Sequence, residues 1–500
     1  MEIFVNSCSH SHAGCLVPLA ALALLLLNTA PVRAANGGAR NAVLDVLVTY
    51  QTCDERLPWR LNPPQNRAGY GLVVGPGRIL TTEDLVRQAT LVEVRRPGRA
   101  SKFTALVANA DPQLNAALLA VRDPALLPHL ESVELATNLD RGAVTRIVQY
   151  EDSGAPQEGA GRIVELSVEA LPSAPSAVLT FRVLSDLRVL NTGAPIFIGS
   201  RLAGLMMRYD AQRQSGFVLP APVLARFLQA AAAPVYRAPP YAGFSWIALV
   251  DPVLRRYLGV PETGDGIQIV QTVPTSSAAG VLLPNDVVTR WDGFAVDNQG
   301  FYLDPDYGRL RLNHAISGRR HAGDSVAVEL VRGGQPRTVS ITLKPYNEAD
   351  ALTPENTAGA PPDYLVEGGF VLRELTGSYL RSGEHGLANA NPRLAHIYLT
   401  RATQPEHPGD RVVILSSVLP DPINIGYQEF RDDVVTAVNG EPVRNLRDVV
   451  RCVDRDGGIT RLTLYSVGVD LALDPALRAA ANARIASTYR IPELRRISAP

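Results

Sequence analysis

The chain has 500 residues, of which 46% are hydrophobic and 19% are charged, and its formal net charge is -1. These proportions describe a globular protein, exclude a disordered or fibrous one, and lack the basic excess of most nucleic-acid binders. Since domains usually hold roughly 100–200 residues, we expect about three of them.

The first 34 residues have the pattern of a secretory signal peptide. Leu16–Leu27 is an almost unbroken apolar run that is short for a membrane-spanning helix, and Val32-Arg33-Ala34 forms a small-residue cleavage pattern. The residues before the run include no lysine or arginine, and an uncleaved membrane anchor stays open as the alternative. The signal predicts an exported protein of the periplasm or cell envelope.

The cysteines do not indicate a metal site. Cys8 and Cys15 would leave with the signal, and the remaining pair, Cys53 and Cys452, belongs to no Cys-x-x-Cys or His/Cys cluster. Export allows a disulfide between these two, although two independent thiols is the simpler interpretation. We expect no metal and no cofactor.

Residues 44–228 carry short apolar segments separated by turns. Leu44, Val46, Val48 and Tyr50 alternate with other residues at period two. Many short strands spaced by Gly/Pro turns favour an all-β barrel or sandwich. A short helix entered through Pro220 closes the segment, and an Ala/Pro-rich linker follows it.

An internal repeat occupies the second half of the chain. Asp286–Val296 recurs as Asp433–Val443, and in each copy a buried strand enters an Asp-Gly or Asn-Gly turn, a strong hairpin signal. Strand-like segments flank both copies. A Pro- and Ala-rich stretch at 349–363 predicts a second linker, and residues 475–489 have helical periodicity.

Several motifs together resemble the HtrA/Deg serine proteases. Their GSGF-like strand, LTNAHVV strand end, DLALL strand and GNSGGP loop are matched in order by Gly69–Leu72, Leu80–Val86, Leu114–Leu119 and Leu190–Pro195. The repeat is similar to the core of a PDZ domain. The resemblance implies a mainly β fold, a chymotrypsin-like double β-barrel followed by two PDZ (α+β) domains, and a homo-oligomer, usually a trimer.

This family architecture divides the chain into six parts. They are a signal peptide at 1–34, a trypsin-like domain at 35–235, a first PDZ domain at 242–346, a linker at 347–363, a second PDZ domain at 364–466 and a helical C-terminal tail at 467–500.

The residues at the catalytic positions depart from the family. Hydrolysis needs a hydroxyl nucleophile, a histidine base, an orienting aspartate and an oxyanion hole. The matched motifs place Asp84 at the histidine position, Asn115 at the aspartate and Thr192 at the serine. In the oxyanion loop Leu190 replaces the first glycine, while Gly193 is kept, and a branched side chain there disfavours the backbone that glycine tolerates. No intact catalytic set is therefore expected.

PDZ domains bind an extended C-terminal peptide as an added strand, and an x-Φ-Gly-Φ loop captures its carboxylate. Tyr257, Leu258, Gly259 and Val260 fit that pattern ahead of a predicted strand. The alternative is a packing turn beside a vestigial groove. In the second PDZ domain the comparable run, Ser378–Arg381, has arginine in place of glycine, which favours packing against neighbours.

Two functions therefore compete. The first is a pseudoprotease that binds C-terminal or unfolded peptide segments as a scaffold, chaperone or regulator of protein quality control. The second is an active serine endopeptidase, which needs a histidine from elsewhere. His129 is the only histidine in residues 35–235, and the sequence does not place it near Thr192.

Overall fold

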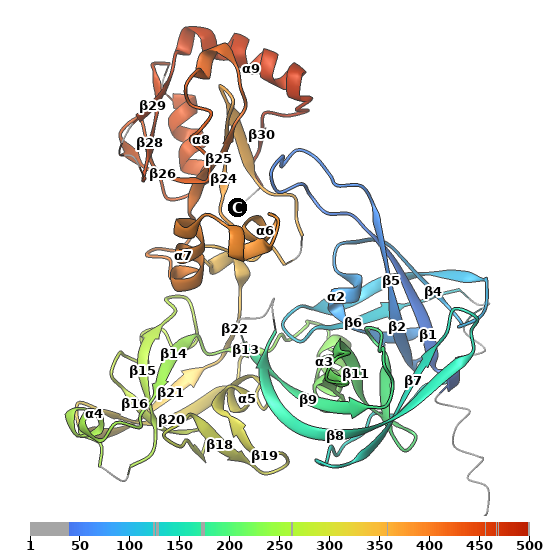
Figure 1. Cartoon of the computed structure of the whole chain (residues 1–500). Helices are drawn as coiled ribbons and strands as arrows, with labels where there is room; N and C mark the ends of the chain where they lie inside the picture. The colour runs from blue at the N-terminus through green and yellow to red at the C-terminus, as the bar shows by residue number, and fades with distance from the viewer. Residues whose placement is uncertain are drawn as a thin grey trace, which may run out of the picture.

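Figure 1 shows the computed structural model of the chain, which describes residues 40–498 apart from 124–125, 127–129, 172–175, 262–263, 358, 456, 467 and 469. The predicted signal segment, with Cys8 and Cys15, and also His129, lie outside the described residues. Among the helices of the described part, none has the length and apolar character needed to cross a membrane.

Residues 43–220 form two closed six-stranded barrels, ordered β1-β2-β3-β6-β5-β4 and β10-β11-β12-β9-β8-β7. The predicted alternation in the first strand is confirmed, because Leu44, Val46 and Val48 are all buried. The strands are β1 (Val43–Tyr50), β2 (Gln65–Gly75), β3 (Arg78–Thr81), β4 (Ala89–Arg95), β5 (Lys102–Asp111), β6 (Ala116–Ala120), β7 (Val144–Tyr150), β8 (Pro156–Ala170), β9 (Ala177–Ser185), β10 (Pro195–Ile198), β11 (Arg201–Asp210) and β12 (Ser215–Pro220).

Two helices complete the barrels. The single-turn helix α2 (Glu83–Val86) follows β3, and α3 (Ala221–Ala232) follows β12. Helix α3 starts after Pro220 with a second proline in its first turn, where the missing N–H costs no helical hydrogen bond. Its buried face includes Leu224 and Phe227, which belong to the same core as the barrel strands.

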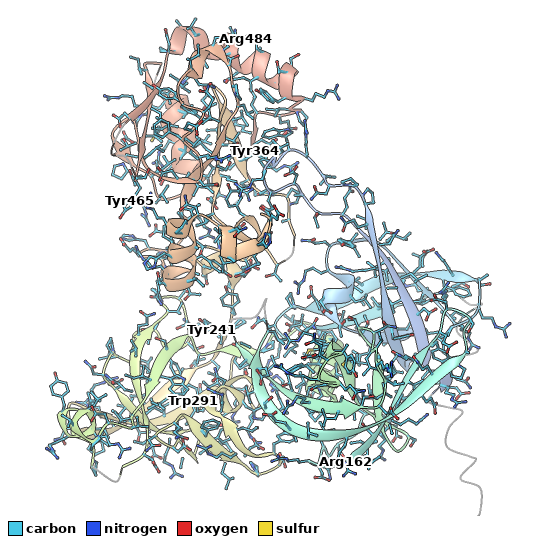
Figure 2. All side chains as sticks on the ribbon, in the orientation of Figure 1. Arg162, Tyr241, Trp291, Tyr364, Tyr465 and Arg484 are labelled. Carbon is cyan, nitrogen blue, oxygen red and sulfur yellow. The ribbon has the colours of Figure 1, made fainter. Side chains whose placement is uncertain are left out.

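A first α+β domain follows, with strands ordered β14-β15-β16-β20-β21. Asp292 and Gly293 both have positive φ, +50° and +83°, so the predicted Asp-Gly hairpin turn is present. The fully buried Trp291 precedes it (Figure 2). The elements are β13 (Pro240–Tyr241), β14 (Phe244–Ala248), α4 (Pro252–Tyr257), β15 (Ile267–Thr272), β16 (Val287–Trp291), β17 (Phe294–Ala295), β18 (Phe301–Asp304), β19 (Gly308–Arg311), α5 (Leu312–Ser317), β20 (Ser325–Arg332), β21 (Gln335–Thr342) and β22 (Lys344–Pro345).

The second α+β domain has a sheet ordered β29-β28-β26-β25-β24-β23-β30, with the second copy of the repeat in β26 and β27. Asn439 and Gly440, at φ +53° and +80°, form its hairpin turn. The elements are η2 (Glu348–Asp350), β23 (Tyr364–Glu367), β24 (Phe370–Glu374), α6 (Gly377–Arg381), η3 (Gly386–Asn389), α7 (Pro392–Arg401), β25 (Val413–Val418), η4 (Pro422–Asn424), β26 (Asp433–Val438), β27 (Glu441–Pro442), α8 (Leu446–Arg455), β28 (Thr460–Leu464), β29 (Asp470–Leu473), α9 (Pro475–Tyr489) and β30 (Arg495–Arg496).

The C-terminal residues predicted as a separate tail, 467–500, contribute to this second domain. Strand β29 pairs with β28, and β30 pairs with β23. Helix α9 buries Ala481 and Ile485 in a cluster with Val366 and Val371 of the sheet. The helix that the periodicity predicted is present, and it packs on the sheet of the second domain.

The loop between β1 and β2, residues 51–64, reaches from the first barrel to the second α+β domain (Figure 1). We call it the docking hairpin. Trp59 packs on Tyr364 at 5.9 Å between ring centroids, where the hairpin meets the domain (Figure 2). Arg56 donates to the Tyr379 hydroxyl at 2.7 Å and to Asp432 at 2.9 Å. Tyr379 belongs to the run predicted to pack against its neighbours, and it does so here.

The centre of this contact is an ion pair at a fully buried arginine. The Arg373 guanidinium has no exposed surface, and it donates to the Glu55 carboxylate at 2.7 Å and to the Glu55 carbonyl at 2.5 Å. Cys53 lies in the same hairpin and Cys452 lies in α8, and both thiols are free, as the simpler interpretation predicted.

The buried pair makes the hairpin contact testable. Removing one partner of a buried ion pair usually costs about 3–5 kcal/mol, because the other charge stays buried and uncompensated. We expect Glu55→Gln to weaken the contact by about 3 kcal/mol and to speed amide hydrogen exchange in β24, measured by mass spectrometry on the full chain. Glu384→Gln, which changes an exposed glutamate of the same domain, is the control. Unchanged exchange in β24 would show that the hairpin is not docked in solution.

Candidate functional site

The elements that carry two of the residues at the catalytic positions, α2 and the loop of Thr192, meet at strand β2, and Asn115 contacts α2. Asp84 lies in α2, Asn115 precedes β6 and Thr192 precedes β10. The Asp84 N–H donates to the Asn115 side-chain oxygen at 2.8 Å. A Cβ added to Gly69 would lie 2.6 Å from the Thr192 carbonyl oxygen and 2.8 Å from a methyl of Leu85, so both the loop and α2 press on this glycine.

Asn115 acts here as a backbone acceptor. Its φ of +51° lies in the left-handed region, which asparagine tolerates better than most residues. Its side-chain oxygen binds an N–H of the first turn of α2, which has no partner inside the helix. This contact fixes α2 against the start of β6.

Arginines hold the other end of α2. Arg67 donates to the Leu85 carbonyl at 2.7 Å and also to the Arg87 carbonyl, which satisfies acceptors that a one-turn helix leaves open. Burial lowers the pKa of Arg67. The buried Glu83 pairs with Arg87 at 2.5 Å. Asn115 therefore binds the first turn of α2, and Arg67 binds its last turn.

The side chains of Asp84 and Thr192 do not form a proton-transfer pair. Within the described residues, nothing donates a hydrogen bond to the buried Oδ1 of Asp84. In the same part of the chain, the Thr192 hydroxyl has no hydrogen bond to any imidazole or carboxylate, whereas its carbonyl accepts the Tyr70 N–H at 3.0 Å. A general base has to lie within about 2.6–3.2 Å of the proton that it removes.

The loop that carries Thr192 is held by backbone contacts. The Gln149 side chain donates to the Val189 carbonyl at 2.9 Å and accepts the Asn191 N–H at 3.4 Å. Leu190 is 7% exposed, with a negative φ. The Gly193 N–H donates to the Met206 carbonyl at 2.8 Å, so this amide is already occupied.

The segment Tyr257–Val260 does not form a carboxylate-binding loop, and that prediction is wrong in the structure. The N–H groups of Leu258, Gly259 and Val260 donate to carbonyls of Leu254, Arg256 and Arg255, which leaves none of them for a ligand. Leu258 and Val260 are 8% and 4% exposed and pack in a core cluster, while Tyr257 is 81% exposed. A Cβ on Gly259 would lie 2.4 Å from the Gly334 Cα, so the glycine permits close packing.

A different segment of the same domain has the required features. Tyr241-Ala242-Gly243-Phe244 also fits x-Φ-Gly-Φ, and Gly243 has φ +68°. Among the described residues, the N–H groups of Ala242 and Gly243 have no hydrogen-bond acceptor. The loop leads directly into β14, an edge strand that pairs with β15 alone. The sequence signal for this loop was Gly243 immediately before an apolar strand. Pro239 and Pro240 stand just ahead of it and favoured a linker instead.

The edge of β14 is partly open. Ile247 is 47% exposed, and Ser245 and Ala248 are exposed. Phe244 turns inward onto Trp291 at 5.8 Å between ring centroids. An edge strand with free N–H and C=O groups is the surface to which an extended peptide adds.

Comparisons with known proteins agree with this architecture. A family model described as a PDZ domain matches residues 353–496. The chain is 27% identical to "Protease Do-like 2, chloroplastic" of Arabidopsis thaliana over 448 residues, 85% of this chain and 70% of that protein. It is 25% identical to "Protease Do-like 4, mitochondrial" of the same plant over 423 residues, 83% of this chain and 77% of that protein.

Solved structures support the fold. A variant of the HtrA-type protease AlgW, solved with a decapeptide, aligns with a TM-score of 0.50 at 19% identity, over 63% of this chain and 97% of that chain. The predicted fold class is confirmed: the protein is mainly β, with two six-stranded barrels followed by a PDZ-like α+β region.

The contact between Asn115 and α2 can be tested by stability. Asn115→Ala removes the acceptor of the Asp84 N–H. It also places alanine, which tolerates positive φ less well than asparagine, in the left-handed region. We expect a loss of about 2 kcal/mol in the free energy of unfolding, measured with urea. Asn115→Asp keeps both the acceptor and the tolerance of positive φ and should stay near wild type. Equal loss in both variants would contradict the assigned role.

Proposed function

The chain belongs to the HtrA/Deg-type protease family, and we propose that it is a pseudoprotease, an exported member that binds peptides without hydrolysing them. Its role is that of a scaffold, chaperone or regulator in protein quality control at the cell envelope. The observation that carries the proposal is the Thr192 hydroxyl, which has no base within hydrogen-bonding distance among the described residues.

The chemistry of the site supports the loss of hydrolysis. A carboxylate is much too weak a base to take the proton of an alcohol, so Asp84 cannot replace a histidine here. Asn115 is engaged with the backbone of α2 and has no imidazole to orient. Loss of one member of a triad already costs about 10⁴–10⁶ in turnover. Three changed positions therefore leave no useful rate, even though their effects are not additive.

Peptide binding is the activity that the fold retains. The free N–H groups of Ala242 and Gly243 offer a site for a terminal carboxylate, and β14 offers an edge for the peptide backbone. The family relative AlgW was solved with a decapeptide, which is consistent with this role. We propose that C-terminal or unfolded apolar segments of other proteins bind at the first α+β domain.

The second α+β domain has a different role in this proposal. Its Tyr379 lies between two arginines, Arg56 of the docking hairpin and Arg373, each with its guanidinium carbon 4.7 Å from the ring centroid. We infer that this surface serves internal packing. By family resemblance we also propose a homo-oligomer, with a trimer as the expected form.

An active serine endopeptidase is the competing function, and hydrolysis separates the two. We expect the full chain to show no casein turnover above that of Thr192→Ala, and no labelling by a serine-directed fluorophosphonate. Thr192→Ala removes only the candidate nucleophile and is the matched control. Turnover by the wild type that Thr192→Ala abolishes would make the protein a peptidase.

Peptide binding is tested on the exposed edge of β14. We expect a C-terminal apolar peptide to bind the full chain, and its C-terminally amidated form to bind at least tenfold more weakly, or about 1.4 kcal/mol. Ile247→Glu places a carboxylate beside the site and should weaken binding, measured by fluorescence anisotropy.

Ile459→Glu, at a 58% exposed isoleucine of the second domain, is the matched control and should bind as wild type. If the amidated and free peptides bind equally, or if Ile247→Glu has no effect, the assignment of Ala242–Ala248 as the peptide site is rejected.

A further inference from the structure

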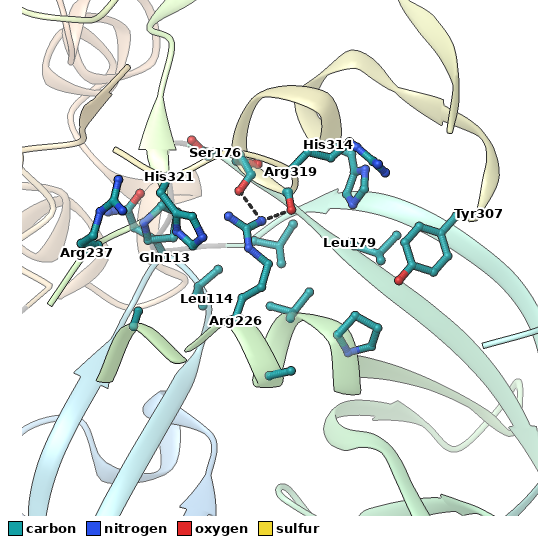
Figure 3. Close-up of a pocket in the computed structure, with 18 of the residues that line it drawn as sticks. Gln113, Leu114, Ser176, Leu179, Arg226, Arg237, Tyr307, His314, Arg319 and His321 are labelled. Carbon is teal, nitrogen blue, oxygen red and sulfur yellow. Dashed lines mark hydrogen bonds between the residues drawn. The ribbon is translucent and has the colours of Figure 1, made fainter. Parts of the chain in front are cut away.

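A second site candidate lies where the second barrel meets the first α+β domain. Helix α3, the start of β9 and helix α5 enclose a cavity of about 460 Å³ (Figure 3). This volume falls within the range of about 300–1,000 Å³ that is typical of small-molecule sites. The cavity shares no residue with Tyr241–Ala248, the proposed peptide site.

The charges that line the cavity are unbalanced. Three arginines and two histidines line it, and the only carboxylate among its described lining residues is that of Asp306. Burial lowers the pKa of both histidines, that of His314 to about 4, so the arginines carry the positive charge. The basic residues are Arg226, Arg237, His314, Arg319 and His321. The Asp306 carboxylate lies 3.5 Å from Arg319, which also pairs with Asp304 at 2.8 Å. The carboxylates of Asp304 and Asp306 are therefore both paired with Arg319.

Arg226 has no carboxylate partner in the part of the chain that the structure describes. Its guanidinium donates to the Ser317 carbonyl at 3.0 Å, to the Arg320 carbonyl at 2.6 Å and to the Gly318 carbonyl. Burial lowers the pKa of Arg226, as expected for a cation removed from water and held by neutral acceptors. An anion in the cavity would supply the missing counter-charge.

Arg237 and His321 line the cavity beside Arg226. Arg237 donates to Asp324 at 3.2 Å, and Asp324 also accepts the His321 N–H of the backbone at 2.9 Å. The His321 imidazole itself makes no hydrogen bond to any described residue. Figure 3 shows His321 and Arg237 on the same side of Arg226.

Much of the remaining wall is apolar, although Gln113, Thr137, Ser176 and Ser317 also line the cavity. Leu114, Leu135, Val178, Leu179, Pro222 and Val223 line the cavity. Leu179 and Tyr307 lie on the side of Arg226 opposite to His321 (Figure 3). A ligand that pairs with Arg226 at one end of the cavity and packs on Leu179 at the other has one anionic group and an apolar chain.

We propose that this cavity binds a medium-chain fatty acid, with its carboxylate at Arg226 and His321 and its chain along Leu179 and Val223. A carboxylate can accept from a guanidinium and an imidazole together, which a neutral head group with one hydroxyl cannot. Because barrel and α+β domain each provide part of the wall, the bound acid favours the arrangement in which the two are packed together.

The ligand requirement is tested with decanoate and the uncharged 1-decanol, which have the same chain length. We expect decanoate to bind the full chain at one site by isothermal titration calorimetry, and decanol to bind at least tenfold more weakly. Equal binding of the two, or no binding of decanoate, would overturn the proposal.

The location is tested with a pair of variants on helix α3. Ala225 lines the cavity and is exposed, so Ala225→Trp should fill the space and abolish decanoate binding. Ala232→Trp, at an exposed position of the same helix that does not line the cavity, is the matched control and should bind as wild type. Undiminished binding by Ala225→Trp would place the ligand elsewhere and reject the proposal.

Arg226→Lys keeps the charge but offers fewer donors, and it should weaken decanoate about fivefold while leaving decanol unchanged. A parallel loss for both ligands would indicate a purely structural role for Arg226 and count against the carboxylate contact. Binding of a C-terminal apolar peptide that Ala225→Trp abolishes, together with no binding of decanoate, would make the cavity a peptide site and reject the fatty acid assignment.

Discussion

The architecture depends on a backbone contact between the two barrels at Tyr70. Its N–H donates to the Thr192 carbonyl, while its hydroxyl accepts the Tyr150 N–H and donates to the Tyr150 carbonyl, both at 2.9 Å. A Cβ at Gly193 would lie only 2.2 Å from the Tyr70 carbonyl oxygen. Strand β2 can approach the second barrel this closely because glycines stand at both contact points, Gly69 and Gly193.

The contact that holds the barrels together uses backbone atoms, whereas hydrolysis would use side chains. The contact uses main-chain atoms of residue 192 and needs no particular side chain there, so the side chain at this position can vary without disturbing the barrels. Asn115 and α2 follow the same logic, since the acceptor to the Asp84 N–H can be an amide as well as a carboxylate. A site of this kind can lose its reaction while its geometry persists, which is why fold similarity alone does not establish hydrolysis.

Local sequence signals predicted most of the fold. Period-two alternation identified β1, and the Asp-Gly and Asn-Gly turns identified both hairpins, because each pattern reflects interactions within a few residues. The misassigned loop at Tyr257–Val260 has a different cause. Its four-residue pattern also suits a packed turn, and only the backbone acceptors and the neighbouring Gly334 distinguish the two. The docking hairpin was not foreseen, since Glu55 and Arg373 are far apart in sequence and nothing local links them.

Two of the long-range junctions among the described residues are built around a guanidinium. Arg373 binds a carboxylate and a carbonyl of the hairpin, and Arg226 binds three carbonyls at the end of α5 and just after it. A guanidinium has five donors in a fixed plane, so one side chain can join several acceptors of another domain. A lysine ammonium, which lacks this planar set of donors, could not hold the same acceptors. The chain has only two lysines, Lys102 and Lys344. The two junctions still differ in charge: Glu55 neutralises Arg373, whereas Arg226 donates only to backbone carbonyls among the residues that the structure describes. The Arg373 junction therefore contains its own counter-charge, whereas an anion bound beside Arg226, as we propose, would supply the one that its junction lacks among the described residues.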